Sequence, residues 1–161
     1  FYGRTKSAIA SGFTRGLLMK YMLDTNICVY IIKRKPSTIL QKLLRKKITD
    51  IAISSNTLSE LEYGVEKSFH RERNRLALAE FIAPLSVLSY DDHAALAYGK
   101  LRVLLEREGS PIGSLDTLIG AHALSAKAIL VTNNEREFKR IPELKVENWI
   151  SSHHPSCPQQ A

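Results

Sequence analysis

Residues 21–26 read Tyr-Met-Leu-Asp-Thr-Asn, a short apolar run that leads into an acid. The apolar run predicts a buried β-strand, and Asp24 follows at the point where that strand ends. An acid at the carboxyl end of a buried strand points into the crevice where open α/β sheets bind ligands. This stretch therefore predicts the first strand of an α/β domain and one residue of its functional site.

Apolar runs of strand length alternate with longer helical patterns along the rest of the chain. The expected strands are about 20–23, 51–54, 85–88, 128–131 and 144–147. The expected helices are about 26–33, 37–47, 56–67, 71–83, 91–108, 114–126 and 135–140. Ser55 or Asn56 is expected to cap the third helix, Asp91 or Asp92 the fifth, and Gly109 to stop the fifth. The alternation predicts a mostly parallel sheet with helices on both faces.

Two further carboxylates occupy places comparable with that of Asp24. Asp116 stands where a helix rich in small residues begins, and Glu60 lies one turn into the helix that follows strand 51–54. Glu62 flanks the same buried stripe as Glu60, and helical geometry alone does not choose between these two acids. Each acid taken singly has an ordinary explanation, as a helix cap or as part of a solvated face. Their joint placement at strand ends favours a common site.

Three acids in one crevice repel one another unless a cation lies between them. Carboxylate oxygens suit hard ions, so the pattern predicts Mg²⁺ or Mn²⁺. The chain also carries a net charge of +7, and a basic exterior around an acidic site suits an enzyme that acts on an anionic substrate. The alternative is that this charge serves only solubility. Arg4, Lys6 and Arg15, in the first 18 residues, account for three of the positive charges.

Other polar residues are candidates for the site. Thr132 and Asn134 follow the predicted strand 128–131, where they could support the acids or simply form a turn. His122 lies among small apolar residues and is expected to be packed rather than catalytic. Cys28 and Cys157 are too far apart in sequence for a Cys-x-x-Cys site, which argues against zinc or a disulfide framework and suits a reducing cytoplasm.

Three segments are expected from composition. Residues 1–18 are rich in Gly, Ser and Arg, lack acids, and are interpreted as an extension outside the domain. Residues 19–150 form the predicted domain, and residues 151–161 are expected to be a flexible tail. No apolar run approaches the length of a membrane span.

Four blocks of sequence carry a family resemblance. The blocks are Met22–Asn26, Ser59–Gly64, Gly109–Leu124 and Val131–Phe138, and Val146–Trp149 closes the pattern. Their order and spacing resemble a PIN-domain ribonuclease of the VapC type, the toxin of a bacterial toxin–antitoxin pair. The resemblance implies the PIN-domain three-layer α/β sandwich, with a mostly parallel central sheet flanked by helices.

The resemblance also implies roles for the site residues. Asp24 and Asp116 would bind Mg²⁺ or Mn²⁺, and Glu60 would complete the acidic cluster, since the Glu-Leu-x-x-Gly pattern selects it over Glu62. Many PIN domains carry a fourth acid where this chain has Asn134. The supporting residues implied around these acids are Thr25, Asn26, Thr132 and Asn134.

The family further implies a substrate and partners. The substrate would be RNA, and the enteric branch that this chain resembles implies initiator tRNA, cut in its anticodon stem-loop. A co-expressed antitoxin of the VapB type would inhibit the enzyme by placing a basic side chain among the carboxylates. A homodimer and a larger toxin–antitoxin complex are also expected.

Two other function classes fit parts of the pattern. A phosphoryl-transfer enzyme or phosphoacceptor also places an Asp after the first strand of a similar sheet, but position 26, where one such class needs a second Asp, is Asn. A non-catalytic nucleic-acid-binding module would use the acids structurally. Trapping of a phosphoenzyme would identify the first class, and absence of metal-dependent cleavage the second.

Overall fold

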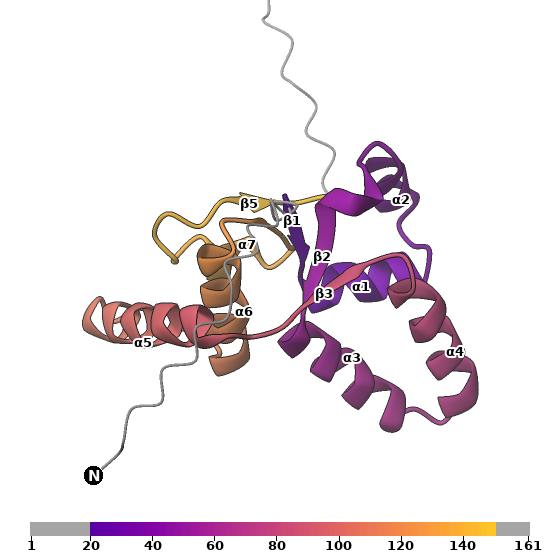
Figure 1. Ribbon diagram of the computed structural model, residues 1–161, viewed down its shortest axis with the longest axis horizontal. Coiled ribbons are helices and arrows are strands. Elements are labelled where there is room, and N and C mark those ends of the chain that lie inside the picture. The colour runs from indigo at the N-terminus through magenta and orange to yellow at the C-terminus, as the bar shows by residue number, and fades with distance from the viewer. Residues whose placement is uncertain (1–19, 151–161) are drawn as a thin grey trace, which may run out of the picture.

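The computed structural model describes residues 20–150, which form one parallel sheet with helices on both sides (Figure 1). The strands are β1 (Tyr21–Leu23), β2 (Ile51–Ser54), β3 (Ser86–Leu88), β4 (Ile129–Val131) and β5 (Val146–Glu147). They lie in the order β3-β2-β1-β4-β5, and every pair of neighbours is parallel. The prediction of a mostly parallel sheet is confirmed, and within residues 20–150 the sheet is entirely parallel.

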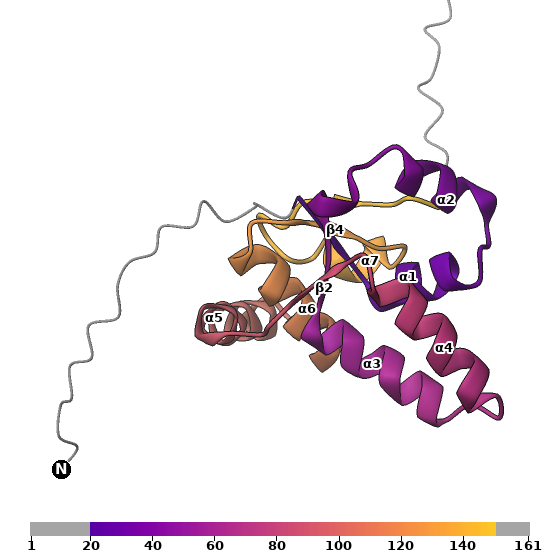
Figure 2. The same ribbon diagram turned by 45° about the vertical axis from the view of Figure 1, so that its right-hand side comes forward.

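Helices connect the strands and cover the sheet (Figures 1 and 2). They are α1 (Thr25–Ile32), α2 (Ser37–Leu44), α3 (Ser55–Glu66), α4 (Arg71–Ile82), α5 (Asp92–Arg107), α6 (Ser114–Ser125) and α7 (Glu135–Phe138), with a 3₁₀ turn η1 (Ile48–Asp50) before β2. These bounds agree with the predicted elements to within a few residues. The difference is largest in α2, which ends at Leu44 rather than near residue 47.

Two apolar clusters form the core, one on each face of the sheet. Tyr21, Leu23 and Ile53 pack on one face with α1, α3, α4 and Trp149. Met22 and Leu130 pack on the other face with α5, α6 and Phe138. Because successive side chains of a strand point to opposite faces, a strand that is buried on both sides must be apolar at every position. The run Tyr21-Met22-Leu23 meets that requirement and is fully buried.

The helix caps differ in one place from those predicted. Ser54, the last residue of β2, caps α3 by accepting a hydrogen bond from the backbone N–H of Asn56, so the prediction of Ser55 or Asn56 as the cap was wrong. The strand passes directly into the helix, without a separate loop residue to serve as the cap. Asp91 caps α5 as one of the two predicted candidates, and Gly109 follows that helix with a positive φ of 63°.

The predicted segments 1–18 and 151–161 lie outside the described residues. Within residues 20–150, no helix combines the length and the apolar character needed to cross a membrane.

Candidate metal-dependent active site

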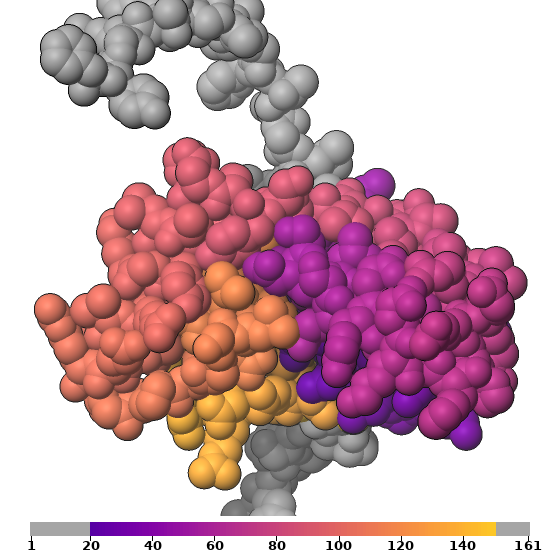
Figure 3. All heavy atoms as spheres, turned by 90° about the horizontal axis from the view of Figure 1, so that it is seen from below, coloured from indigo at the N-terminus to yellow at the C-terminus, as the bar shows by residue number. Residues whose placement is uncertain are grey.

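The register of the sheet brings three strand ends together. Leu23 of β1 is opposite Ile53 of β2 on one side and Val131 of β4 on the other. The next residues, Asp24, Ser54 and Thr132, therefore lie side by side at the carboxyl ends of these three inner strands. Figure 3 shows the molecule from this end, where the orange atoms of α6 lie beside the purple atoms of α3. The predicted convergence of strand ends is thus a direct result of parallel pairing.

Asp24 is a buried carboxylate with both oxygens engaged. Only 3% of the residue is exposed. The side chain caps α1 by accepting a 2.8 Å hydrogen bond from the backbone N–H of Thr25 at Oδ1, and it accepts a 2.7 Å hydrogen bond from the hydroxyl of Thr132 at Oδ2. Asp24 is therefore a helix cap and a site residue at once, and these donors hold its side chain in one orientation.

Glu60 joins Asp24 through α1. The Thr25 hydroxyl donates a hydrogen bond to Oε2 of Glu60, so consecutive residues of one helix start bind two different carboxylates. Glu62, the alternative left open by helical geometry, lies elsewhere and forms an ion pair with Arg75 of α4 at 3.1 Å. The structure places Glu60, and not Glu62, beside Asp24.

Asp116 joins the same network from the other side. The side-chain amide of Asn134 donates to Oδ2 of Asp116 at 3.3 Å, and the backbone N–H of Asn134 donates to the Thr132 hydroxyl at 2.9 Å. Since Thr132 also donates to Asp24, one chain of contacts links Asp116 to Asp24. With Thr25 and Glu60, this network contains residues from all four sequence blocks. We call Asp24, Glu60 and Asp116 the acidic site.

Electrostatic coupling shows that the three carboxyl groups share one environment. Burial raises the pKa of Asp24 most, hydrogen bonds from Thr132 and Thr25 oppose this rise, and Glu60 adds to it. The pKa of Asp116 is raised to about 6, mainly by burial and then by the negative charges of Asp24 and Glu60. Carboxylates whose negative charge raises the pKa of a neighbouring acid lack a compensating positive charge beside them.

The donor set fits a divalent cation. In the described part of the chain, no three Asp, Glu, His or Cys side chains come together as tightly as ligands around one ion, which agrees with mutual repulsion of the carboxylates. The groups that approach one another are nevertheless all oxygen donors, the type that Mg²⁺ and Mn²⁺ prefer. A cation between Asp24 and Asp116 would supply the compensating charge that the raised pKa values indicate is lacking.

One acid near the site was not predicted as a site residue. Glu137 of α7 is among the charges that raise the pKa of Asp116. It also pairs with Arg140 at 3.4 Å. Glu137 lies within the sequence block Val131–Phe138 that carries the resemblance. Its side-chain direction could not be predicted, because a four-residue helix is too short for sequence periodicity to show which face is buried. Asn26, predicted as supporting, is exposed on α1 and is not part of the hydrogen-bond network described above.

Two residues have structural roles. His122 is buried in α6, where Nδ1 lies 2.8 Å from the Ser54 hydroxyl and the ring packs edge-on against Tyr90. Burial lowers its pKa, and the expectation of a packed histidine agrees with this environment. Cys28 is also buried, and burial and the charge of Asp24 raise the pKa of its thiol. Cys157 lies outside the described residues.

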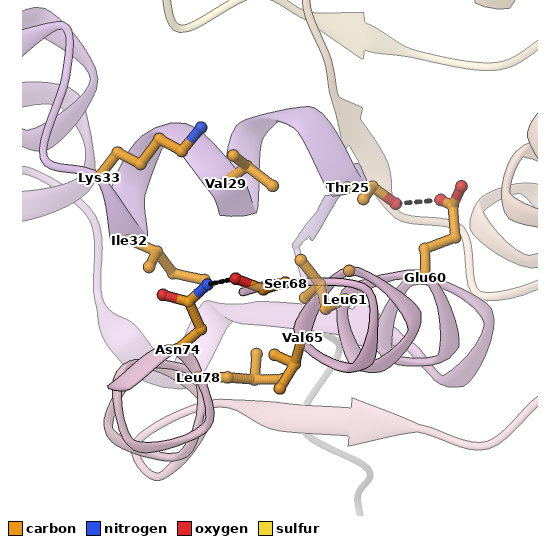
Figure 4. A pocket seen from close by; sticks show the side chains of 11 residues that line it. Thr25, Val29, Ile32, Lys33, Glu60, Leu61, Val65, Ser68, Asn74 and Leu78 are labelled. Atoms are coloured by element: carbon orange, nitrogen blue, oxygen red, sulfur yellow. Dashed lines mark hydrogen bonds between the residues drawn. The ribbon is translucent and has the colours of Figure 1, made fainter. Parts of the chain in front are cut away.

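A groove leads away from the acidic site between α1, α3 and α4 (Figure 4). It has a volume of about 340 Å³, with Thr25 and Glu60 at one end and the hydrogen-bonded pair Ser68 and Asn74 at the other. The side chains between these ends are mostly apolar: Val29, Ile32, Leu61, Val65 and Leu78. An amphipathic helix or an extended apolar segment could lie in this groove and reach the carboxylates.

Comparison with known sequences identifies the family of this chain. Residues 21–144 match the model of the PIN domain. The chain is 46% identical over 132 residues to the tRNA(fMet)-specific endonuclease VapC of Salmonella typhimurium, covering 82% of this chain and 99% of the relative. It is 48% identical over 132 residues to ribonuclease VapC2 of Rickettsia felis, covering 81% of this chain and 98% of the relative.

Solved structures show the same fold. The crystal structure of DNA-bound VapBC from Salmonella typhimurium superposes with a TM-score of 0.78 at 46% identity, covering 81% of this chain and 98% of that chain. VapBC2 from Rickettsia felis, bound to a promoter DNA fragment, superposes with a TM-score of 0.76, also at 46% identity and with 81% and 99% of the two chains covered. The chain therefore belongs to the PIN-domain family and, within it, to the VapC proteins.

Proposed function

We propose that this protein is a Mg²⁺- or Mn²⁺-dependent endoribonuclease and the toxin of a type II toxin–antitoxin pair. The observation that carries this proposal is the hydrogen-bonded network that joins Asp24, Glu60 and Asp116 at one edge of the sheet. Relatives named as ribonucleases, matched over nearly their whole length, support RNA as the substrate. PIN-domain nucleases generally depend on a divalent metal.

Asp24 and Asp116 are the proposed metal ligands, with Glu60 completing the set. When bound, a divalent cation lowers the pKa of water, polarises the phosphate and offsets charge on the departing oxygen. Many PIN domains have a fourth acid at the position of Asn134. We propose that Glu137 takes the place of that acid in this chain, because its negative charge helps to raise the pKa of Asp116.

The surrounding residues orient these acids. Thr132 and the Thr25 N–H fix the carboxylate of Asp24, and the Asn134 amide fixes Oδ2 of Asp116. The Thr25 hydroxyl occupies Oε2 of Glu60, so Oε1 is the oxygen proposed to accept a hydrogen bond from the attacking water. Such fixed acceptors need little rearrangement as the water adds to phosphorus and the RNA oxygen leaves.

The specific substrate that we propose is initiator tRNA, cut in its anticodon stem-loop. The name of the Salmonella relative supports this choice. A stem-loop presents unpaired bases, which are the part of RNA that proteins read most readily. Arrest of translation in the cytoplasm would be the consequence.

A cognate VapB-type antitoxin is the proposed inhibitor. Similarity to VapC chains solved within VapBC complexes supports this partner. The groove between α1, α3 and α4 would hold an apolar face of the antitoxin, and its end at Glu60 would admit a basic side chain. We further propose that residues 19–150 form the nuclease domain, and that the toxin is a homodimer which joins a larger complex with its antitoxin.

Incubation of the purified protein with total tRNA, with and without Mg²⁺, tests the function. End-mapping of the products should reveal one dominant cut in the anticodon stem-loop of initiator tRNA, present only with the metal. Cleavage that persists in EDTA would show that the enzyme needs no divalent metal. A phosphoenzyme trapped in place of cut RNA would replace the nuclease with a phosphoryl-transfer enzyme.

A further inference from the structure

We propose that the outer face of α3 and the turn after it bind unpaired RNA next to the acidic site, with Tyr63 and Phe69 stacking on bases and Lys67 contacting phosphate. We call these three residues the α3 ridge. The inference rests on the proposed ribonuclease function and identifies where the substrate strand lies beyond the cleavage point.

The ridge begins one turn from a residue of the acidic site. Glu60, Tyr63 and Lys67 are spaced i, i+3 and i+7, so they share one face of α3. At a rise of about 1.5 Å per residue, Lys67 lies roughly 10 Å along the helix from Glu60. A strand cut beside Glu60 would therefore continue along this face.

Two large aromatic side chains on the ridge are exposed to solvent. Tyr63 is 66% exposed, and Phe69, in the turn between α3 and α4, is 103% exposed. A lone exposed apolar residue is ordinary, but here one exposed aromatic residue lies one turn from Glu60 and a second follows six residues later. Exposed aromatic rings bind single-stranded nucleic acid by stacking on bases of any sequence.

Positive charge accompanies these rings. The Lys67 ammonium lies 5.7 Å from the centre of the Tyr63 ring. The segment after Lys67 also contains Arg71 and Arg73, against the single acid Glu72. Both arginines line an open hollow together with Phe69. Within residues 20–150, no ion pair engages Lys67, Arg71 or Arg73.

The other acids of α3 are paired with a cation. Glu62 and Glu66 both form ion pairs with Arg75 of α4, which offset the negative charge beside the ridge. Aromatic rings interleaved with cations suit an unpaired RNA strand, which presents bases and phosphates alternately.

Binding is tested in the Asp116→Asn background, where the RNA is not expected to be cut. The probe is a labelled, unstructured 12-nucleotide RNA, followed by fluorescence anisotropy. Phe69→Ala and Tyr63→Ala should each weaken binding about tenfold, as loss of one stacked base does, whereas Phe69→Tyr should retain the parent affinity. Lys67→Ala should lower the slope of log affinity against log salt by about 0.7.

Matched controls lie on α5. Leu96→Ala removes another exposed apolar side chain, and Lys100→Ala another exposed cation, and both should leave RNA binding unchanged. A 12-base-pair RNA duplex should be insensitive to Phe69→Ala, because its bases are not free to stack. Unfolding temperatures of all variants should match that of the parent, since these side chains contribute little to the core.

Equal affinity of the ridge variants and the parent for single-stranded RNA would overturn the inference. So would a loss of affinity for the cognate antitoxin with RNA binding unchanged, which would assign the ridge to that partner. These results are independent of activity: a wild-type protein that cuts no RNA refutes the proposed function, whereas the binding measurements still decide the ridge.

Discussion

Asp116, a proposed metal ligand, shows most directly how an acid of the candidate site affects the stability of the fold. Its pKa of about 6 means that the carboxyl group is harder to ionise in the folded chain than in the unfolded chain, where the ordinary value is 3.8. A raised folded-state pKa contributes stability below the unfolded value, and this contribution is lost as pH rises through about 6. Ionised Asp116 therefore destabilises the metal-free protein at neutral pH.

Asp116→Asn should abolish cleavage and raise the unfolding temperature in EDTA at pH 8. Solvent screening at this half-buried group limits the gain to roughly 1 kcal/mol. The gain should vanish as the pH falls below about 3, where Asp116 of the parent is largely protonated in both the folded and the unfolded state. Thermal melts of both proteins across this pH range test the prediction, and equal melting temperatures at pH 8 would contradict it.

Thr132 has the opposite effect, because its hydroxyl stabilises a buried charge. Thr132→Val keeps the shape but removes the donor to Asp24 and the acceptor for the Asn134 N–H. We expect a loss of about 1–3 kcal/mol at pH 7, measured by urea denaturation, together with slower RNA cleavage. The loss should diminish at acid pH, as Asp24 becomes protonated.

Thr57→Val provides the matched control for Thr132→Val. Thr57 is likewise fully buried, but its hydroxyl has no hydrogen-bond partner among residues 20–150. Replacing that hydroxyl by a methyl group should leave stability unchanged or increase it. A similar loss in both variants would mean that packing, and not the bond to Asp24, determines the effect.

At the scale of elements, the packing of α6 positions Asp116. Gly120 lies one turn after Asp116, where an added Cβ would be 2.3 Å from the Cδ1 atom of buried Ile141. The glycine thus lets α6 approach the segment that follows α7, and it costs helix stability that alanine would restore. Close approach, rather than backbone flexibility, explains its presence in this helix.

Gly120→Ala should therefore destabilise the protein by about 1–2 kcal/mol, as overpacking does. Gly99→Ala, in α5 with open space around the glycine, should instead stabilise by about 0.5–1 kcal/mol. Adding Ile141→Val to Gly120→Ala removes the clashing methyl group and should recover most of the loss. Chemical denaturation of the three variants forms the test, and a stabilising Gly120→Ala would refute the steric argument.

At the scale of the whole molecule, the acidic site and the groove are continuous, and we propose that the antitoxin binds both. An antitoxin segment that fills the groove reaches Glu60 at its inner end. Replacing its site-facing arginine by alanine should weaken inhibition of RNA cleavage in titrations of the intact pair, because a bidentate ion pair with the carboxylates is lost. Unchanged inhibition after every basic substitution would show that the antitoxin blocks RNA by bulk alone.

The match to the PIN-domain model begins at Tyr21, after residues 1–18. Removal of residues 1–18 is therefore expected to leave the unfolding temperature and the rate of RNA cleavage nearly unchanged. Comparison of the truncated and full-length chains, under identical conditions, measures both. Failure of the truncated chain to fold would place the leader within the domain.

Local sequence patterns were enough to predict the strands, most of the helix ends and two of the acids of the candidate site. The apolar run before Asp24 can be stable only as a strand covered on both faces, so the sequence alone predicted an α/β sheet and placed Asp24 at its carboxyl edge. Caps and stops such as Asp91 and Gly109 act through neighbouring backbone groups, and they too could be predicted from sequence. Asp116 was recognisable because its helix is otherwise small and apolar.

Tertiary structure alone decided which polar groups meet. Glu60 and Glu62 flank the same stripe of one helix. The family resemblance favoured Glu60, but the physical distinction comes from Thr25 and Arg75, on other helices, which bind Glu60 and Glu62 respectively. Glu137 reaches Asp116 because α7 packs beside α6, a contact that no period in the sequence records. Side-chain patterns specify each element through local interactions, whereas a site assembled from several elements depends on distances that exist only once they have packed.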